Sequence, residues 1–215
     1  MSDVNPNFAK HGEMNPLFIF CHGAFGCGTN VWFPFAFTTV AEHDCDFISP
    51  DLPNPLKPQY EAWKDVLLDQ IKSKWNKKQP IILVGHSLGG YTLLRLLSDC
   101  PNEDWAHHVK GFYLVSPVVS MKLTPFLHGL SEINFEPILK MPIKFRHIYN
   151  VNDIELNPKN SELLQKIFTD AKVDYKVEIT DTNKYNSHFG GLKHYPCKEI
   201  NDGIISLLHE VDPKL

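Results

Sequence analysis

The stretch Pro80-Ile81-Ile82-Leu83-Val84-Gly85-His86-Ser87-Leu88-Gly89-Gly90 decides the fold of this chain. It begins with a run of aliphatic residues, which is typical of a strand buried on both faces of a parallel sheet. It continues through the pattern G-x-S-x-G into a helical stretch at residues 88–99. A buried strand, a sharp turn centred on a serine and a helix together predict a strand-to-helix elbow.

The two glycines of this pattern, Gly85 and Gly89, stand two residues on either side of Ser87. We expect the turn to be too sharp for side chains at these positions. The Ser87 hydroxyl would then project above the carboxyl end of the sheet, at a helix N-terminus that favours developing negative charge. The alternative is a glycine-rich turn of a nucleotide-binding fold, but this turn carries neither G-x-G-x-x-G nor a P-loop lysine.

Strand-like and helix-like segments alternate along the rest of the chain. Strands are expected at 17–22, 46–49, 80–85, 111–116, 143–151 and 173–180, and helices at 31–43, 59–75, 88–99, 160–171 and 197–211. This alternation predicts one α/β domain over residues 1–215, with a mainly parallel six-stranded sheet and helices on both faces. The alternating pattern of 143–151 indicates a less buried strand. Residues 1–16 are expected to be flexible or loosely packed.

A serine hydroxyl is a weak nucleophile and needs a base, for which His188 is the best-placed histidine. It lies in Asn186-Ser187-His188-Phe189-Gly190-Gly191, directly after the last predicted strand. In this topology the loop returns over the carboxyl edge of the sheet toward Ser87. The other candidates are His194 in the same loop, His209 on the last helix, His147 within a strand, and His86, whose side chain we expect to point elsewhere.

The base in turn needs an orienting carboxylate. Asp153 follows the fifth predicted strand, at the sheet edge where functional groups of open α/β sheets collect. Glu155 is its rival two residues later, and Asp181 follows the sixth strand but shares the loop of the base. The resulting chain order, Ser87 then Asp153 then His188, is the order of the α/β-hydrolases.

An acyl-transfer transition state also needs hydrogen-bond donors for its oxyanion. The backbone N–H of Leu88, directly after the nucleophile, is one expected donor. The loop His22-Gly23-Ala24 follows the first predicted strand, and the Ala24 N–H is the expected second donor; the alternative is a simple turn. Aromatic residues follow this loop, and most are expected in the core. We predict Phe25, Trp32 and His86 to line a substrate pocket.

Composition excludes several other classes of protein. The net charge is −4 and the 21 Lys and Arg are scattered, so no basic nucleic-acid surface is expected. No apolar run approaches the roughly 20 residues that span a bilayer, and the N-terminus lacks a signal-peptide pattern, so we expect a cytoplasmic protein. The five cysteines include no C-x-x-C pair, which favours free thiols over disulfides or a zinc site. Neither a metal nor an organic cofactor is expected.

Five stretches carry a family resemblance: CHGAFGCGTNVWFPF from residue 21, DLPNPLKPQYEAW from 51, LVGHSLGG from 83, YNVNDIELNP from 149 and NSHFGG from 186. The chain resembles α/β-hydrolases over nearly its whole length. The PNP element followed by a tryptophan is narrower, and is similar to the compact, lidless retinoblastoma-binding serine hydrolase family and its bacterial relatives. The vertebrate member's L-x-C-x-E motif is absent, so a retinoblastoma-type partner is not expected.

The resemblance implies a three-layer sandwich with strand order 2-1-3-4-5-6, without the superfamily's first two antiparallel strands. It also implies a triad of Ser87, Asp153 and His188 that cleaves a small ester or amide through an acyl-enzyme. A noncatalytic interaction module on the same scaffold, or an acyltransferase with the same triad, are the alternatives. The connection 117–142 must supply a crossover helix of about 12 residues. Little then remains for a cap, which predicts a small or short-acyl substrate and no lipid interface.

Overall fold

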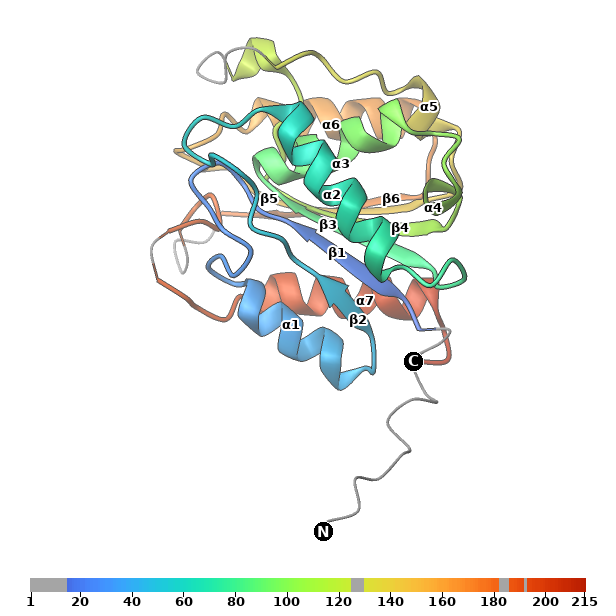
Figure 1. Ribbon diagram of the computed structural model, residues 1–215. Coiled ribbons are helices and arrows are strands. Elements are labelled where there is room, and N and C mark those ends of the chain that lie inside the picture. The colour runs from blue at the N-terminus through green and yellow to red at the C-terminus, as the bar shows by residue number, and fades with distance from the viewer. Residues whose placement is uncertain (1–14, 125–129, 182–185, 192) are drawn as a thin grey trace.

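The computed structural model describes residues 15–124, 130–181, 186–191 and 193–215, in which strands and helices alternate (Figure 1). The strands are β1 (Leu17–Cys21), β2 (Asp46–Ile48), β3 (Ile81–His86), β4 (Val109–Val115), β5 (Lys144–Asn150) and β6 (Tyr175–Thr180). The helices are α1 (Phe33–Glu42), α2 (Tyr60–Lys74), α3 (Leu88–Asp99), α4 (Asp104–His107), the 3-10 helix η2 (Met121–Leu123), α5 (Glu136–Leu139), α6 (Lys159–Asp170) and α7 (Lys198–Val211). Of the predicted loose segment 1–16, residues 1–14 lie outside the described residues.

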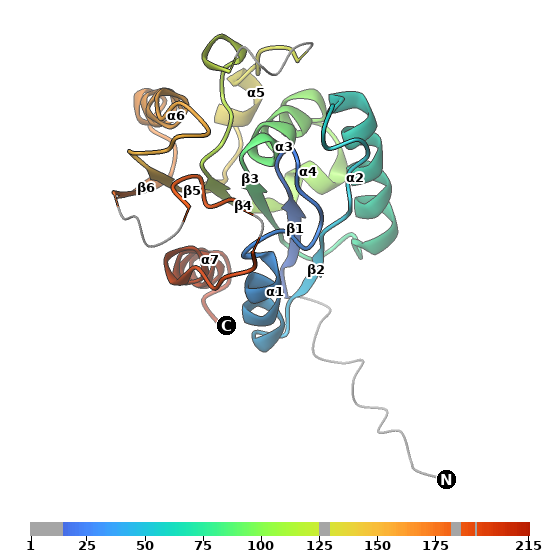
Figure 2. The ribbon, with the colours of Figure 1, turned by 90° about the vertical axis from the view of Figure 1, so that its left-hand side faces the viewer.

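The six strands form one parallel sheet in the order β2-β1-β3-β4-β5-β6, which confirms the predicted order. Figure 2 looks along the strands and shows α1 and α7 on one side of the sheet and α2, α3 and α6 on the other. Right-handed crossovers between parallel strands produce this three-layer arrangement. All strands therefore end at one edge of the sheet, and the loops after β1, β3 and β5 meet there.

The central strands are continuous apolar runs because a hydrophobic core covers each face of the sheet. Side chains alternate across a strand, so Ile81 and Leu83 of β3 pack toward α2 and α3, while Ile82 and Val84 pack toward α1 and α7. All four are fully buried. A strand covered on both faces must be apolar throughout, and this makes the approach to Ser87 rigid.

β5 departs from the prediction of a less buried strand, which was wrong. Every residue of β5 after Lys144 is buried, because β5 lies between β4 and β6 and groups of α6, α7 and the start of β6 cover its side chains. Its polar side chains are buried together with partners. Arg146 forms ion pairs with Asp174 and Glu210, and His147 hydrogen-bonds the hydroxyls of Tyr175 (2.8 Å) and Ser161 (3.1 Å). The exposed edge is β6 instead.

The connection from β4 to β5 also differs from the prediction. Its described part contains η2 and α5, each shorter than five residues, so the expected crossover helix of about 12 residues is wrong. Side chains of other elements form hydrogen bonds with the backbone of this connection, in place of the hydrogen bonds that a helix would form. Asn160 Oδ1 accepts the N–H groups of Val119 (2.9 Å) and Ser120 (3.0 Å), and the Tyr91 hydroxyl donates to the Ser131 carbonyl (2.9 Å).

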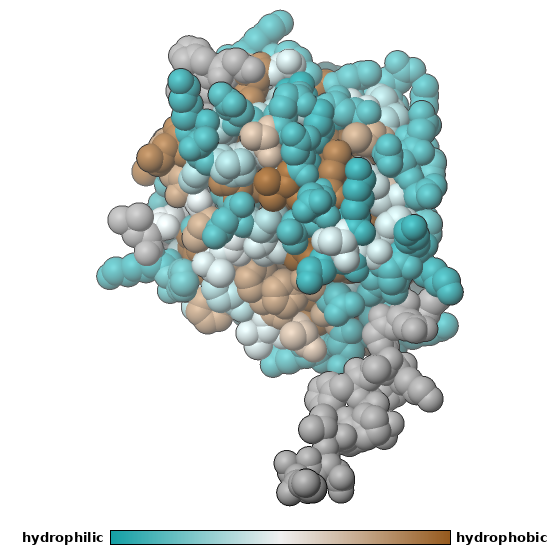
Figure 3. Space-filling view, in the orientation of Figure 1, coloured by the Kyte–Doolittle hydropathy of each residue, from teal (hydrophilic) through white to brown (hydrophobic). Residues whose placement is uncertain are grey.

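The molecular surface in Figure 3 is hydrophilic over α2 and more hydrophobic over α1 and β2. Phe37 and Phe47 belong to these two elements, and their rings stack with centroids 4.4 Å apart. No helix in the described part of the chain has the length and apolar character that crossing a bilayer requires.

Candidate active site

Ser87 occupies the predicted elbow between β3 and α3, with φ 53° and ψ −120°. A positive φ is costly for a residue other than glycine, so neighbouring groups must hold it. The Ser87 N–H donates to the Val115 carbonyl (2.9 Å), and the Ser87 carbonyl accepts from the N–H groups of Gly90 and Val118 (both 3.0 Å). The strained serine is thus fixed by its own helix and by the end of β4.

The predicted need for glycine on both sides of Ser87 is confirmed. A Cβ on Gly89 would lie 2.0 Å from the Cys21 carbonyl oxygen, and one on Gly85 would lie 2.6 Å from Gly90 Cα. A Cβ on Gly23 would lie 2.9 Å from Ser87 Cβ. The loop after β1 therefore passes directly beside Ser87, where an oxyanion loop would have to lie.

The structure places the Asp153 carboxylate against the His188 imidazole. His188 Nδ1–H donates to Asp153 Oδ2 over 2.7 Å, and both side chains are at least nine-tenths buried. Asp153 Oδ1 accepts the N–H groups of Glu155 (2.9 Å) and Leu156 (2.8 Å), which fixes the carboxylate. A proton held on Nδ1 leaves Nε2 as an acceptor, which is the state that a general base requires.

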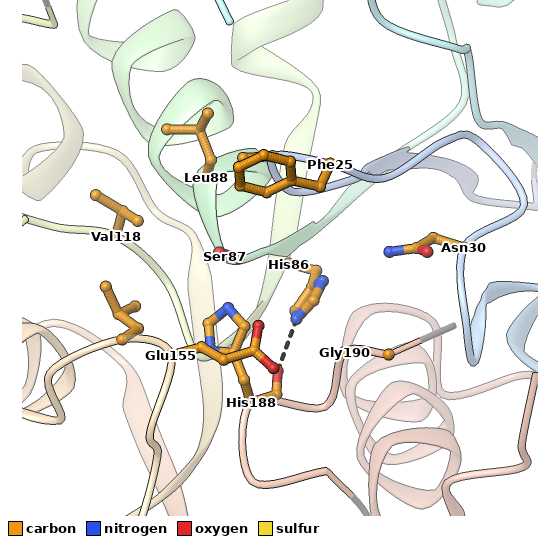
Figure 4. Close-up of a pocket in the computed structure, with 12 residues that line it drawn as sticks. Phe25, Asn30, His86, Ser87, Leu88, Val118, Glu155, His188 and Gly190 are labelled. Atoms are coloured by element: carbon orange, nitrogen blue, oxygen red, sulfur yellow. Dashed lines mark hydrogen bonds between the residues drawn. The ribbon is translucent and has the colours of Figure 1, made fainter. Parts of the chain in front are cut away.

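His188 and Ser87 line the same cavity, which Figure 4 shows from the side of the sheet edge. Among the residues that the structure describes, none hydrogen-bonds the Ser87 hydroxyl. The sequence rivals of His188 lie elsewhere: His147 is enclosed in its network under α6, His209 is on α7, and His194 is exposed.

Two backbone N–H groups are free to bind an oxyanion at this point. His22 Nδ1–H donates to the Gly23 carbonyl (2.8 Å), and His22 Nε2 accepts the Leu52 N–H (3.0 Å). The Gly23 C=O and the Ala24 N–H belong to the same trans peptide and therefore point in opposite directions. The bond from His22 to the Gly23 carbonyl thus directs the Ala24 N–H away from the His22 imidazole. Neither Ala24 N–H nor Leu88 N–H donates to any residue within the described ranges, whereas the next N–H, of Phe25, is bonded to the Pro55 carbonyl (2.9 Å).

The cavity has a volume of about 460 Å³. Its wall is formed by Ala24, Phe25, Asn30, His86, Ser87, Leu88, Val118, Glu155, Leu156, His188, Gly190 and Gly191. Phe25 and His86, which were predicted to line a substrate pocket, line this cavity. Trp32 is not: it is 1% exposed and packs against Phe33 in the core beneath α1, so its predicted place in the pocket wall is wrong.

Sequence reasoning missed Asn30, Val118 and Leu156 as wall residues, and considered Glu155 only as a possible orienting acid. Glu155 and Leu156 directly follow Asp153 at a strand end, and this position could have indicated them. No sequence signal pointed to Asn30 or Val118. No group of three or more metal-ligating side chains occurs in the described part of the chain.

His86 is buried beside His188. Its Nε2–H donates to the His188 carbonyl over 2.8 Å, and the two rings are 5.1 Å apart. Burial, with the neighbouring His188 imidazole, lowers the pKa of His86 to about 3, so the side chain is neutral. His86 therefore holds the backbone of His188 through a donor that carries no charge.

We predict that His86→Leu lowers kcat by about tenfold with little change in KM, because the bond to the His188 carbonyl is lost and the base is misplaced. His86→Gln retains an N–H donor and should keep most of the activity. Steady-state kinetics on a neutral ester would measure both. Equal losses in the two variants would show that packing, and not this hydrogen bond, sets the position of His188.

Comparison with known proteins agrees with this geometry. Residues 16–135, more than half of the chain, match the family described as alpha/beta hydrolase fold. No curated protein matches the chain. Among solved structures, the ydeN gene product from B. subtilis has a TM-score of 0.64 at 21% identity, covering 90% of this chain and 98% of that one.

Two further structures are similar. Est1E from Butyrivibrio proteoclasticus, solved with ferulic acid, has a TM-score of 0.68 at 15% identity and covers 94% of this chain and 92% of its own. An esterase from Pyrococcus furiosus has a TM-score of 0.66 at 12% identity, and the match covers 92% of this chain and 82% of the esterase. The narrower resemblance to the retinoblastoma-binding serine hydrolases stays a prediction. The family match, the sheet order and the serine elbow agree, and the chain belongs to the alpha/beta hydrolase fold family.

Proposed function

We propose that this protein is a serine hydrolase that cleaves a small carboxylic ester or amide through an acyl-enzyme. One observation carries the proposal: the Asp153–His188 pair, joined at 2.7 Å, opens onto the cavity that holds the strained Ser87. The similar esterase from Pyrococcus furiosus, and Est1E with its bound ferulic acid, are compatible with this chemistry.

In the proposed acylation, Ser87 Oγ attacks the carbonyl carbon and its proton passes to His188 Nε2. The carbonyl π bond breaks, and its electron pair becomes an oxyanion that accepts hydrogen bonds from Ala24 N–H and Leu88 N–H. Asp153 stabilises the imidazolium that forms. The oxyanion then collapses, the bond to the leaving group breaks, and His188 gives its proton to the departing oxygen or nitrogen.

Deacylation repeats these steps with water as the nucleophile. His188 Nε2 removes a proton from a water molecule while the water oxygen attacks the acyl carbon. Collapse of the second tetrahedral intermediate breaks the bond to Ser87 Oγ, which regains its proton from His188, and the carboxylic acid leaves. Leu88, Val118 and Leu156 provide an apolar wall for a short acyl group, in a cavity of the size that binds small molecules.

The proposal is tested by covalent labelling with a neutral fluorophosphonate. We expect the reagent to modify the folded protein at Ser87, because attack on phosphorus uses the same base and oxyanion donors. Peptide mass spectrometry would locate the label, and Ser87→Ala should remove it.

Ser161→Ala is the matched control, since Ser161 also hydrogen-bonds a histidine but is buried away from the cavity. It should be labelled like the wild type. A folded wild-type protein that stays unlabelled would favour a noncatalytic interaction module instead. Product analysis with an added alcohol or amine would reveal an acyltransferase.

A further inference from the structure

Glu155 brings a negative charge to the wall of the cavity. Its Oε1 accepts a hydrogen bond from Asn186 Nδ2 (2.8 Å), which holds the carboxylate in place. Within the described ranges, Glu155 forms no ion pair, and no lysine or arginine lines the cavity. The remaining described residues of the wall, other than the two histidines, carry no ionisable acidic or basic group. A fixed and uncompensated carboxylate in a small cavity attracts a cation.

The carboxylate lies on the leaving-group side of the site. A Cβ placed on Gly190 would be 3.7 Å from Glu155 Oε2 and 3.8 Å from His188 Cδ2, so carboxylate and imidazole share this corner of the cavity. Figure 4 shows Glu155 beside His188, with Val118 and Leu88 farther along the wall. His188 must protonate the leaving group, and the leaving group therefore occupies the corner that Glu155 faces.

We propose that Glu155 selects esters whose leaving alcohol carries an ammonium group. This inference rests on the proposed function and names the substrate class of the same site.

The test compares two acetate esters of the same shape, acetylcholine and 3,3-dimethylbutyl acetate, which differ only in the charge of the leaving alcohol. We expect wild-type kcat/KM to be about fivefold higher for the cationic ester at low salt, as for one exposed ion pair. The ratio should approach one in Glu155→Gln and fall with rising salt. Glu162→Gln removes an exposed carboxylate of α6 outside the cavity wall and should keep the wild-type ratio.

A second measurement does not need turnover. Choline should protect Ser87 from a neutral fluorophosphonate at lower concentration than 3,3-dimethylbutan-1-ol does, and Glu155→Gln should remove this difference. Equal protection, a ratio near one in the wild type, or a preference that survives Glu155→Gln would each overturn the inference while leaving the hydrolase intact. Absence of both labelling and hydrolysis would instead refute the proposed function, and the inference would fall with it.

Discussion

Asp153→Asn is expected to lower kcat for a neutral ester by about 10³- to 10⁴-fold. The two N–H groups that bind Oδ1 would also bind the oxygen of the asparagine, and would turn its NH₂ toward His188. A donor facing Nδ1 forces the imidazole proton onto Nε2, where it can no longer accept the Ser87 proton. Steady-state kinetics, with circular dichroism as a check of folding, would measure the loss.

Glu155→Gln is the matched comparison, because it removes a carboxylate two residues away from the same loop. Its effect on the neutral ester should be far smaller than that of Asp153→Asn, since Glu155 hydrogen-bonds Asn186 and not the imidazole. The reverse order of effects would assign the orienting carboxylate to Glu155.

Acid should destabilise this protein through its buried neutral histidines. Burial lowers the pKa of His147 and of His86 from 6.5 to about 3, so below pH 6.5 the unfolded chain binds protons that the folded chain does not. Stability is therefore fully present above pH 6.5 and is lost as the pH falls toward 3. Between its two pKa values, each such histidine gives stability a slope of about 1.4 kcal/mol per pH unit.

Urea unfolding between pH 7.5 and 4.5 would measure this slope. His147→Gln keeps hydrogen-bonding capacity without a titrating group, so its slope should be smaller by up to about 1.4 kcal/mol per pH unit. Ser161→Ala removes a hydrogen-bond partner of His147 but no titrating group, and should lower stability while keeping the wild-type slope. An unchanged slope in His147→Gln would show that His147 is not the residue responsible.

The order of the sheet could be predicted because the local signals agree with the global fold. β1 and the first four residues of β3 are uninterrupted apolar runs, and Gly85 and Gly89 frame a serine at a turn where any side chain would collide with backbone. β5 could not be predicted in the same way. Its alternating residues resemble those of a half-exposed strand, and only the partners of Arg146 and His147, from β6, α6 and α7, explain their burial.

The placement of Asp153 beside His188 follows from topology, because strand ends of a parallel sheet meet at one edge. The wall of the cavity does not follow from topology. Trp32 and Phe25 are both aromatic residues after β1, and one is buried while the other is exposed. That difference depends on how the loop packs, and loop packing leaves no periodic pattern in the sequence. The short helices η2 and α5 escaped prediction for the same reason.

The backbone bonds that hold Ser87 come partly from a segment later in the chain. Both the Val115 carbonyl and the Val118 N–H that bind Ser87 arrive with the end of β4, later in the chain than the elbow itself. While β4 is undocked, the positive-φ serine lacks two of the bonds that compensate its strain. We therefore expect the proposed reactivity of Ser87 toward a fluorophosphonate to require that the end of β4 is in place.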